Sequence, residues 1–246
     1  MIPALTGPFI PAKGYSAGRN SGAVIYLGIH TAEGATTRES LGSYFAGTTK
    51  GSSNAGMDER GVGGYAEYVR YADTPWTNPP INSRSDTLEI CGFAHWTAQE
   101  WGSKPVLLDG VAHWIAWRAA VRGIPLVHRH DGDIGTGVFG HADVNAAWHK
   151  STHTDPGPNF PWATVMAKAA NISQTPPAST PWFTRDLGRG MTGGDVRHVQ
   201  HSLKVPLSNV FDTPTERAVR AERIRRHLSL SPGNIVDLAL AKTLKG

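Results

Sequence analysis

The feature that most constrains the fold of this chain is a stretch rich in Pro, Ser and Thr at residues 171–183, which includes the sequence NISQTPPASTPW. Its prolines lack a backbone N–H, and it has no apolar periodicity, so it is typical of a linker. We therefore predict that it separates a larger domain, residues 1–170, from a smaller one, residues 184–246. With Cys91 as the single cysteine, no intramolecular disulfide is possible, and the cores, with or without a metal, must hold the domains.

The composition is that of an ordinary globular protein, with 39% hydrophobic and 18% charged residues. Residues 1–20 are rich in Pro and Gly and lack a basic leader, so we expect an extended surface segment and no signal peptide. No apolar run reaches the length of about 18 residues that a membrane span needs, which predicts no membrane insertion.

The net charge is +4 and the isoelectric point is about 9.3. Much of the positive charge comes late in the chain, in Arg217, Arg220, Arg223, Arg225, Arg226 and Lys242. This distribution favours affinity for an acidic polymer, or else it marks a solvated helix face. Because basic and aromatic residues do not alternate there, we expect no nucleic-acid partner.

The larger domain alternates strand and helix patterns, which predicts an α/β fold. Residues 23–30 form an apolar run that ends in His30, and Thr36 with Glu39 has the spacing of a capping box before a helix over 36–46. Thr97 and Glu100 repeat that spacing. Further strands are predicted at 53–57, 65–71, 87–91 and 124–128, a loop at 73–85, and helices at 105–122 and 162–170.

The smaller domain contains three short amphipathic patterns that are separated by Pro and Gly. They cover residues 195–203, 215–228 and 234–244. A segment of about 60 residues with this pattern predicts a small helical domain.

The stretch GHADVNAAWHKSTHTDPGP, residues 140–158, contains candidate metal ligands. With His30 from the first strand, His141 and Asp155 form a His, His, carboxylate set that suits zinc in an open catalytic site. The alternative is that histidines at strand ends are satisfied polar groups. His149 and His153 are further candidates, either as replacement ligands or as donors to an oxyanion.

Glu89 lies in the middle of an otherwise apolar strand pattern. A carboxylate there is costly unless it is paired, protonated or close to a cation, and burial would raise its pKa towards that of a general base. The alternative is a solvated strand face. Cys91 would share that face, as a ligand or, as we favour, as a small packing residue.

Four segments resemble a known family: YLGIHTAEG, SRSDTLEICG, VFGHADVN and THTDPGPNFPW. In order and approximate separation they resemble the zinc-dependent N-acetylmuramoyl-L-alanine amidases of the peptidoglycan-recognition-protein fold. The resemblance covers residues 24–170 and implies a central mixed β-sheet flanked by helices. It implies that His30, His141 and Asp155 bind Zn²⁺ and that Glu89 is the catalytic acid/base. The family often has Lys where this chain has His153, which implies a titratable oxyanion stabiliser.

The segments LGRGMTGGDVRHVQHSL and VFDTPTERAVRAERIRRHLSL resemble the peptidoglycan-binding three-helix module. The chain departs from the usual pattern at Val199, where Leu is usual, and at Asp212, where Gly is usual. Together the two resemblances imply a bacteriophage endolysin with antimicrobial activity. Such an enzyme is expected to be a monomer that stays in the host cytoplasm until it is released to the cell wall.

The resemblance implies hydrolysis of the amide between N-acetylmuramic acid and L-alanine in bacterial peptidoglycan, which lyses the host cell. Trp76, Asn78 and Asn82 are candidates for the wall of the substrate groove. Two alternatives stay open: a peptidoglycan-recognition protein that cleaves nothing, and a zinc peptidase that cuts within the stem peptide.

Overall fold

The computed structural model describes residues 2–20, 22–174, 185–230 and 234–244. The chain forms two compact units, residues 1–175 and 176–246, each with a hydrophobic core of its own. In these described ranges, no helix combines the length and the apolarity that are needed to cross a membrane.

The larger unit is built on a five-stranded mixed sheet with the order β4-β3-β6-β2-β7. Its strands are β2 (Tyr26–Thr31), β3 (Ala55–Met57), β4 (Tyr65–Glu67), β6 (Ser85–Ile90) and β7 (Gly137–Gly140). All neighbours are parallel except the pair β3 and β4. A separate two-stranded sheet pairs β1 (Tyr15–Ser16) with β5 (Thr74–Pro75), a short strand within the predicted 73–85 loop.

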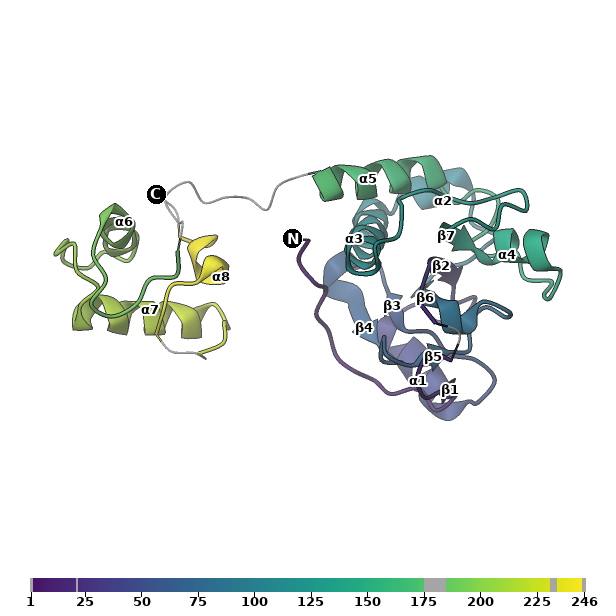
Figure 1. The fold of residues 1–246 in the computed structure, drawn as a ribbon, viewed down its shortest axis with the longest axis horizontal. Helices are drawn as coiled ribbons and strands as arrows, with labels where there is room; N and C mark the ends of the chain where they lie inside the picture. Colours follow the sequence, from purple (N-terminus) through teal and green to yellow (C-terminus); the bar gives the residue numbers. More distant parts are fainter. Residues whose placement is uncertain (1, 21, 175–184, 231–233, 245–246) are drawn as a thin grey trace. The chain divides into compact units, whose positions relative to one another are not determined.

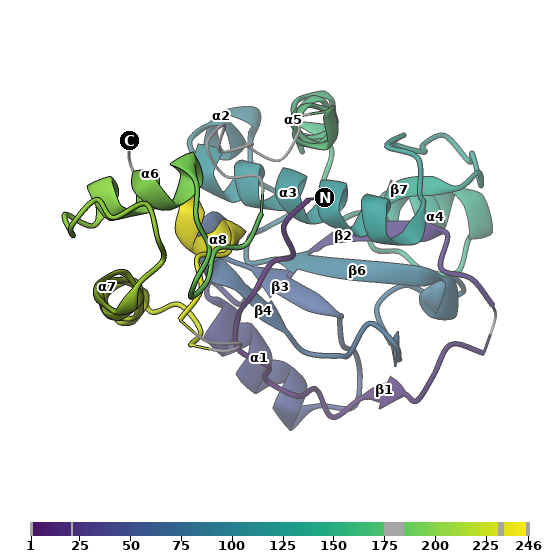
Figure 2. The same ribbon diagram turned by 60° about the vertical axis from the view of Figure 1, so that its left-hand side comes forward.

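Helices cover both faces of the sheet, as Figures 1 and 2 show. In Figure 2, α2 (Ala98–Gly102), α3 (Pro105–Arg122) and α5 (Trp162–Gln174) lie above the sheet, and α1 (Arg38–Gly47) lies below it. The remaining helix of the larger unit, α4 (His141–Trp148), follows β7 directly. The predicted α/β class with a central mixed sheet is thus confirmed.

Strand alternation divides the side chains of the two central strands between the two faces. Leu27 and Ile29 of β2, and Leu88 and Ile90 of β6, pack into the main core together with α3. His30 and Glu89 alternate with these residues and therefore lie on the opposite face, where the strands pair them in register.

Three local predictions are wrong. The N-cap of α1 is Thr37 and not Thr36, because Ser40 completes the capping box with Thr37 while Glu39 pairs with Arg38 and Arg60. Residues 124–128 form no strand beyond a single bridge of His128 to Val138, since Pro125 removes a donor.

The third wrong prediction is the start of the linker. Helix α5 continues to Gln174, because Ala169 is buried in the main core and Ile172 packs against it. Residues 171–174 are therefore helical, and residues 175–183 of the predicted linker lie outside the described part of the chain. By contrast, α3 has the predicted bounds, with Pro105 in its first turn and Gly123 in the left-handed conformation after its end.

The smaller unit contains α6 (Gly194–Ser202), α7 (Thr213–Arg225) and the short α8 (Leu238–Ala241) around a core of its own, which confirms the predicted small three-helix domain.

Two buried polar side chains connect its helices. The Gln200 amide donates to Ser208 Oγ, Val210 O and Thr215 Oγ1. The Arg223 guanidinium, only 2% exposed, donates to Ser229 O, Ile235 O and the Asp237 carboxylate.

A buried ion cluster attaches the sheet to α3. Asp86 of β6 is fully buried and accepts hydrogen bonds from Arg19, Arg118 and Arg122 at 2.7–3.0 Å. Asp86→Asn would leave these guanidinium groups without their counter-charge, so we expect the larger unit to lose about 3–5 kcal/mol of unfolding free energy. Urea unfolding of the full chain measures this loss, and the transition of the smaller unit should not move.

Asp109→Asn is the matched control, because Asp109 is an exposed residue of α3 that pairs with Lys168 at the surface. An equal loss of stability in the two variants would contradict the role of the Asp86 cluster.

Candidate metal centre

The carboxyl ends of three neighbouring parallel strands bring the candidate residues together. His30 lies near the end of β2, Glu89 near the end of β6, and His141 directly after β7. Because parallel strands end at the same edge of a sheet, residues far apart in the sequence converge there, as ligand sites commonly do in α/β folds.

Asp155 completes a buried group with the two histidines. Its Oδ2 lies 2.8 Å from His30 Nδ1, and its Oδ1 lies 3.3 Å from His141 Nδ1. One potential ligand atom from each of these residues lies within 4.8 Å of the others, and all three residues are buried. The imidazole rings of His30 and His141 meet edge to face, with centroids 5.0 Å apart.

This group fits a zinc ion. Ligand atoms of a tetrahedral zinc site lie about 3.3 Å apart when the metal–ligand distances are about 2.0–2.1 Å. The distance from Asp155 to His141 has this value, at 3.3 Å, and the distance from Asp155 to His30 is shorter, at 2.8 Å. The Nε2 atoms of His30 and His141 are buried without a hydrogen-bond partner among the described residues, so protein hydrogen bonds alone do not satisfy these rings. Two imidazoles and one carboxylate leave a fourth position for water or substrate.

Local sequence features explain how the ligands are held. Gly28 lies two residues before His30, and a Cβ atom there would lie only 3.1 Å from the His30 Nε2 atom, so glycine leaves space for the ring. The backbone N–H groups of His141 and Ala142 both donate to Asp155 O, at 2.8 and 3.2 Å. The first turn of α4 therefore attaches one ligand segment to the other.

Gly157 forms the turn after Asp155. Its φ is +95°, which favours glycine, and a Cβ atom would lie 1.9 Å from Ala94 O. The Asp-Pro-Gly sequence is therefore required by the path of the backbone as well as by the chemistry of Asp155.

The two acidic side chains of the site have opposite pKa shifts. Burial alone would raise the pKa of Asp155, but hydrogen bonds from His141 and His30 hold it well below its usual range. Burial, then the nearby charges of Asp155 and Glu33, raise the pKa of Glu89 well above its ordinary value. Glu89 Oε2 is buried without a hydrogen-bond partner among the described residues. It is the kind of carboxyl group that can accept and return a proton.

The remaining candidates lie outside the buried group. His153 is exposed and stacks on His141, with ring centroids 4.7 Å apart and an interplanar angle of 14°, and its Nδ1 is 3.8 Å from Asp155 Oδ1. His149 ends α4 in the left-handed conformation and is exposed. Cys91 is buried in a small apolar cluster, where burial raises the pKa of its thiol, so it is a packing residue.

A cavity of about 440 Å³ opens over the site. His30, Glu89, His141, His153 and Asp155 line it, together with Trp76 and Asn82 from the predicted groove loop. Asn78 is fully buried instead and does not line it; its N–H donates to Asn82 Oδ1. Three exposed lining residues were not predicted from the sequence: Tyr44 and Lys50 belong to no motif, and Lys150 lies within the 140–158 stretch but is not a metal-ligand type.

No protein-family model and no curated protein sequence matches this chain. Among solved structures, the hydrolase AmiA of Staphylococcus aureus, in complex with its ligand, has a TM-score of 0.52 at 14% identity. The match covers 68% of this chain and 84% of AmiA. The chain shares the fold of this hydrolase. At this identity the likeness concerns the fold alone.

Two further structures are similar at lower scores. A selenomethionine derivative of AmpD has a TM-score of 0.47 at 16% identity, covering 67% of this chain and 93% of AmpD. The E. coli N-acetylmuramyl-L-alanine amidase AmiD, in complex with anhydro-N-acetylmuramic acid-L-Ala-D-gamma-Glu-L-Lys, has a TM-score of 0.43 at 16% identity. That match covers 92% of this chain and 90% of AmiD.

The ligand assignment stays a prediction that metal analysis can test. We expect about one zinc ion per chain in the wild type and loss of that zinc in Asp155→Ala, because the two histidines alone leave the site without its only anionic ligand. Mass spectrometric metal analysis after dialysis measures the content. His149→Ala, outside the buried group, should retain zinc. Full zinc content in Asp155→Ala would instead point to His149 or His153 as the third ligand.

Proposed function

We propose that the larger unit is a zinc-dependent amidase that hydrolyses the amide between the lactyl group of N-acetylmuramic acid and the L-alanine of the stem peptide. The observation that carries the proposal is the convergence of His30, His141 and Asp155 beside Glu89 in one cavity. A bound zinc ion would supply Lewis-acid chemistry and lower the pKa of a bound water from about 16 towards 7.

Glu89 is the proposed general base and acid. Its carboxylate accepts the proton of the attacking water and returns it to the leaving amine, so that one group serves both halves of the reaction. Its burial and raised pKa support this role, because a carboxyl group with an ordinary pKa is a weak acid catalyst at neutral pH.

His153 is the proposed donor to the oxyanion of the tetrahedral intermediate. Its exposed imidazole stacks on His141 and lines the cavity, which supports this role. Donors of this kind elsewhere contribute about 3 kcal/mol to transition-state stabilisation. Lys150 lines the same cavity and brings a permanent positive charge to this side.

The choice of peptidoglycan as substrate is supported by the four sequence segments that resemble muramoyl-alanine amidases. The fold shared with the hydrolase AmiA supports hydrolysis as the type of reaction. We propose that the smaller unit binds the cell wall and that the chain acts as an endolysin, monomeric and held in the host cytoplasm until release. The resemblance of its two segments to a peptidoglycan-binding module supports this role.

Digestion of purified peptidoglycan, followed by mass spectrometry of the fragments, tests the activity against its rivals. An amidase yields free stem peptides and intact glycan. A recognition protein yields no fragments, and a peptidase yields new peptide ends while L-alanine stays attached to the sugar. Either of the last two patterns would overturn the proposal.

We expect Glu89→Gln to lose turnover by about 10²–10⁴-fold, because the amide cannot carry the proton. The wild-type zinc content should persist, since Glu89 is outside the ligand group. Release of stem peptides and metal analysis measure the two effects. Glu59→Gln, an exposed substitution outside the cavity, is the control and should keep both. Retained turnover in Glu89→Gln would exclude Glu89 as the base.

Removal of residues 176–246 should separate adsorption from hydrolysis, because each unit has its own core. We expect the remaining larger unit to hydrolyse soluble muropeptides at the wild-type rate and to bind wall sacculi more weakly than the full chain. A sedimentation assay with sacculi measures the binding. Equal sedimentation of the two proteins would remove the wall-binding role of the smaller unit.

A further inference from the structure

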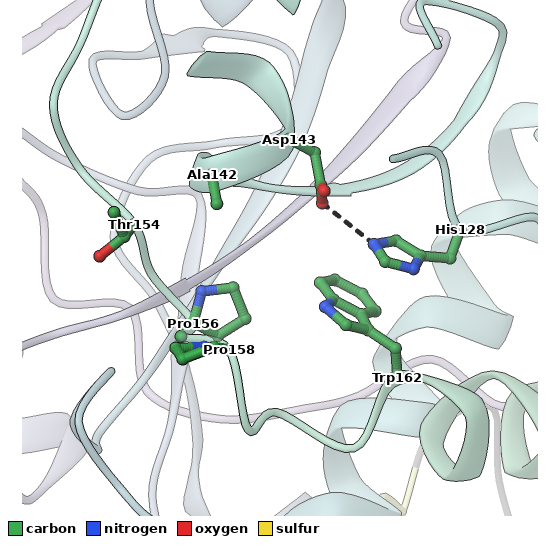
Figure 3. Close-up of a pocket in the computed structure, with 8 residues that line it drawn as sticks. His128, Ala142, Asp143, Thr154, Pro156, Pro158 and Trp162 are labelled. Carbon is green, nitrogen blue, oxygen red and sulfur yellow. Dashed lines mark hydrogen bonds and ion pairs between the residues drawn. The ribbon is translucent and has the colours of Figure 1, made fainter. Parts of the chain in front are cut away.

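A second pocket, of about 500 Å³, lies beside the metal centre (Figure 3). The segment from Thr154 to Pro158 separates the two cavities. Asp155 lines the metal cavity, whereas Thr154, Pro156 and Pro158 line the second pocket. Its other lining residues are His128, Ala142, Asp143, Gly157 and Trp162.

One wall of this pocket is rigidly organised. The His128 ring stacks on the Trp162 indole, with centroids 3.8 Å apart and an interplanar angle of 12°. His128 Nε2 lies 3.0 Å from Asp143 Oδ2, the contact drawn in Figure 3, and the Gly140 N–H donates to the same oxygen at 2.7 Å. These contacts fix the orientation of the indole and of the carboxylate.

Polar atoms remain available in the pocket. Among the described residues, no partner is present for the Trp162 indole N–H, for Asp143 Oδ1 or for the Thr154 hydroxyl group. Figure 3 shows the indole nitrogen on the side of Trp162 that faces Pro156. The pocket thus combines apolar walls of proline, alanine and tryptophan with one N–H donor, one carboxylate acceptor and one hydroxyl group, as small-molecule sites do.

A third hollow shares lining residues with both this pocket and the metal cavity, including Glu33 of the metal cavity. The hollow, of about 290 Å³, shares His153 and Asp155 with the metal cavity and Thr154 with the second pocket. A chain-like ligand that is held at the metal centre can therefore continue past His153 and Thr154 into the second pocket.

We propose that this pocket is a subsite for an N-acetylated sugar of the glycan strand, next to the muramoyl residue that carries the scissile amide. The proposal rests on the proposed amidase function. Such a sugar combines an apolar ring face and an acetamido methyl group, which suit Pro156, Pro158 and Ala142, with hydroxyl and amide groups that match Asp143 and Trp162.

Charge favours the glycan over the stem peptide in this pocket. Its lining contains the Asp143 carboxylate and no Lys or Arg, so the carboxylates of a stem peptide would meet a like charge. The metal cavity also contains carboxyl groups, from Glu33, Glu89 and Asp155, but it adds Lys50 and Lys150, which can pair with the carboxylates of a stem peptide. We therefore assign the glycan to the Trp162 side of the metal and the stem peptide to the Lys50 side.

A pair of alanine substitutions tests the subsite. Ala142 and Ala146 are both exposed on α4, one turn apart, but only Ala142 lines the pocket. Ala142→Phe should fill the pocket, and Ala146→Phe is the matched control. The probe is chitotetraose, a neutral oligomer of N-acetylglucosamine that contains no scissile amide.

The readout is the indole N–H resonance of Trp162 in the full chain, which is assigned by its absence in Trp162→Phe. Chitotetraose should shift this resonance in the wild type and in Ala146→Phe with similar affinity. In Ala142→Phe its affinity should be roughly tenfold weaker, or too weak to detect. A tenfold change in affinity corresponds to about 1.4 kcal/mol. No shift in the wild type, or equal affinities in the two alanine variants, would overturn the subsite.

Kinetics provide a second, independent arm. Ala142→Phe should raise KM for muropeptides that carry several sugars, without raising KM for a muropeptide with a single sugar. An equal rise for both substrates would also overturn the subsite. If the wild type binds chitotetraose at Trp162 but hydrolyses no muropeptide, the proposed amidase function fails while the sugar site stands.

Discussion

The candidate metal centre depends on the two ways in which Asp155 contacts the rest of the structure. Its backbone carbonyl accepts N–H bonds from His141 and Ala142, so it satisfies two of the donors that the start of α4 leaves open. Its carboxylate contacts the imidazoles of His30 and His141. The same residue therefore fixes the helix that carries one ligand and completes the ligand group, which explains why a loop residue can be as well positioned as the strand residues.

Burial has opposite consequences for the two carboxyl groups of the site because their neighbours differ. Asp155 has two imidazoles within hydrogen-bonding reach, and these outweigh the desolvation of its charge. Glu89 is paired in register with His30 on the neighbouring strand, yet its buried oxygen has no donor among the described residues. Desolvation and the charge of Asp155 therefore act on Glu89 without compensation. Two neighbouring carboxyl groups therefore have pKa shifts of opposite sign, one lowered and one raised.

The sequence predicted best those features that local chemistry decides. Helix α3 could be bounded because Pro105 and Gly123 mark its two ends. Helix α4 was not predicted because it is only eight residues long and its N-cap is Gly140. The Asp143 carboxylate accepts the Gly140 N–H, so no Ser, Thr or Asn side chain marks the cap in the sequence. The spacing of the candidate ligands could not show their convergence, because that depends on the order of strands in the sheet.

The tertiary contacts of polar residues were least predictable. Asn78 was expected in the groove wall and is buried instead, whereas Lys50 and Lys150 line the cavity although no pattern marks them. Asp86 lies just before the strand predicted at 87–91, yet in the structure it is the counter-charge of three arginines. In each case the environment of the side chain comes from segments that are distant in sequence, and periodicity carries no information about them.

The charges that line the cavity connect metal binding with the state of the proposed base. Three carboxylates, from Glu33, Glu89 and Asp155, face two lysines, Lys50 and Lys150. Without a cation, burial and the charges of Asp155 and Glu33 raise the pKa of Glu89. A divalent cation at the histidines and Asp155 reverses the local sign, which favours the ionised form of Glu89 that a general base requires. Loss of the proposed metal would therefore also raise the pKa of the proposed base, because both proposed functions depend on the same positive charge.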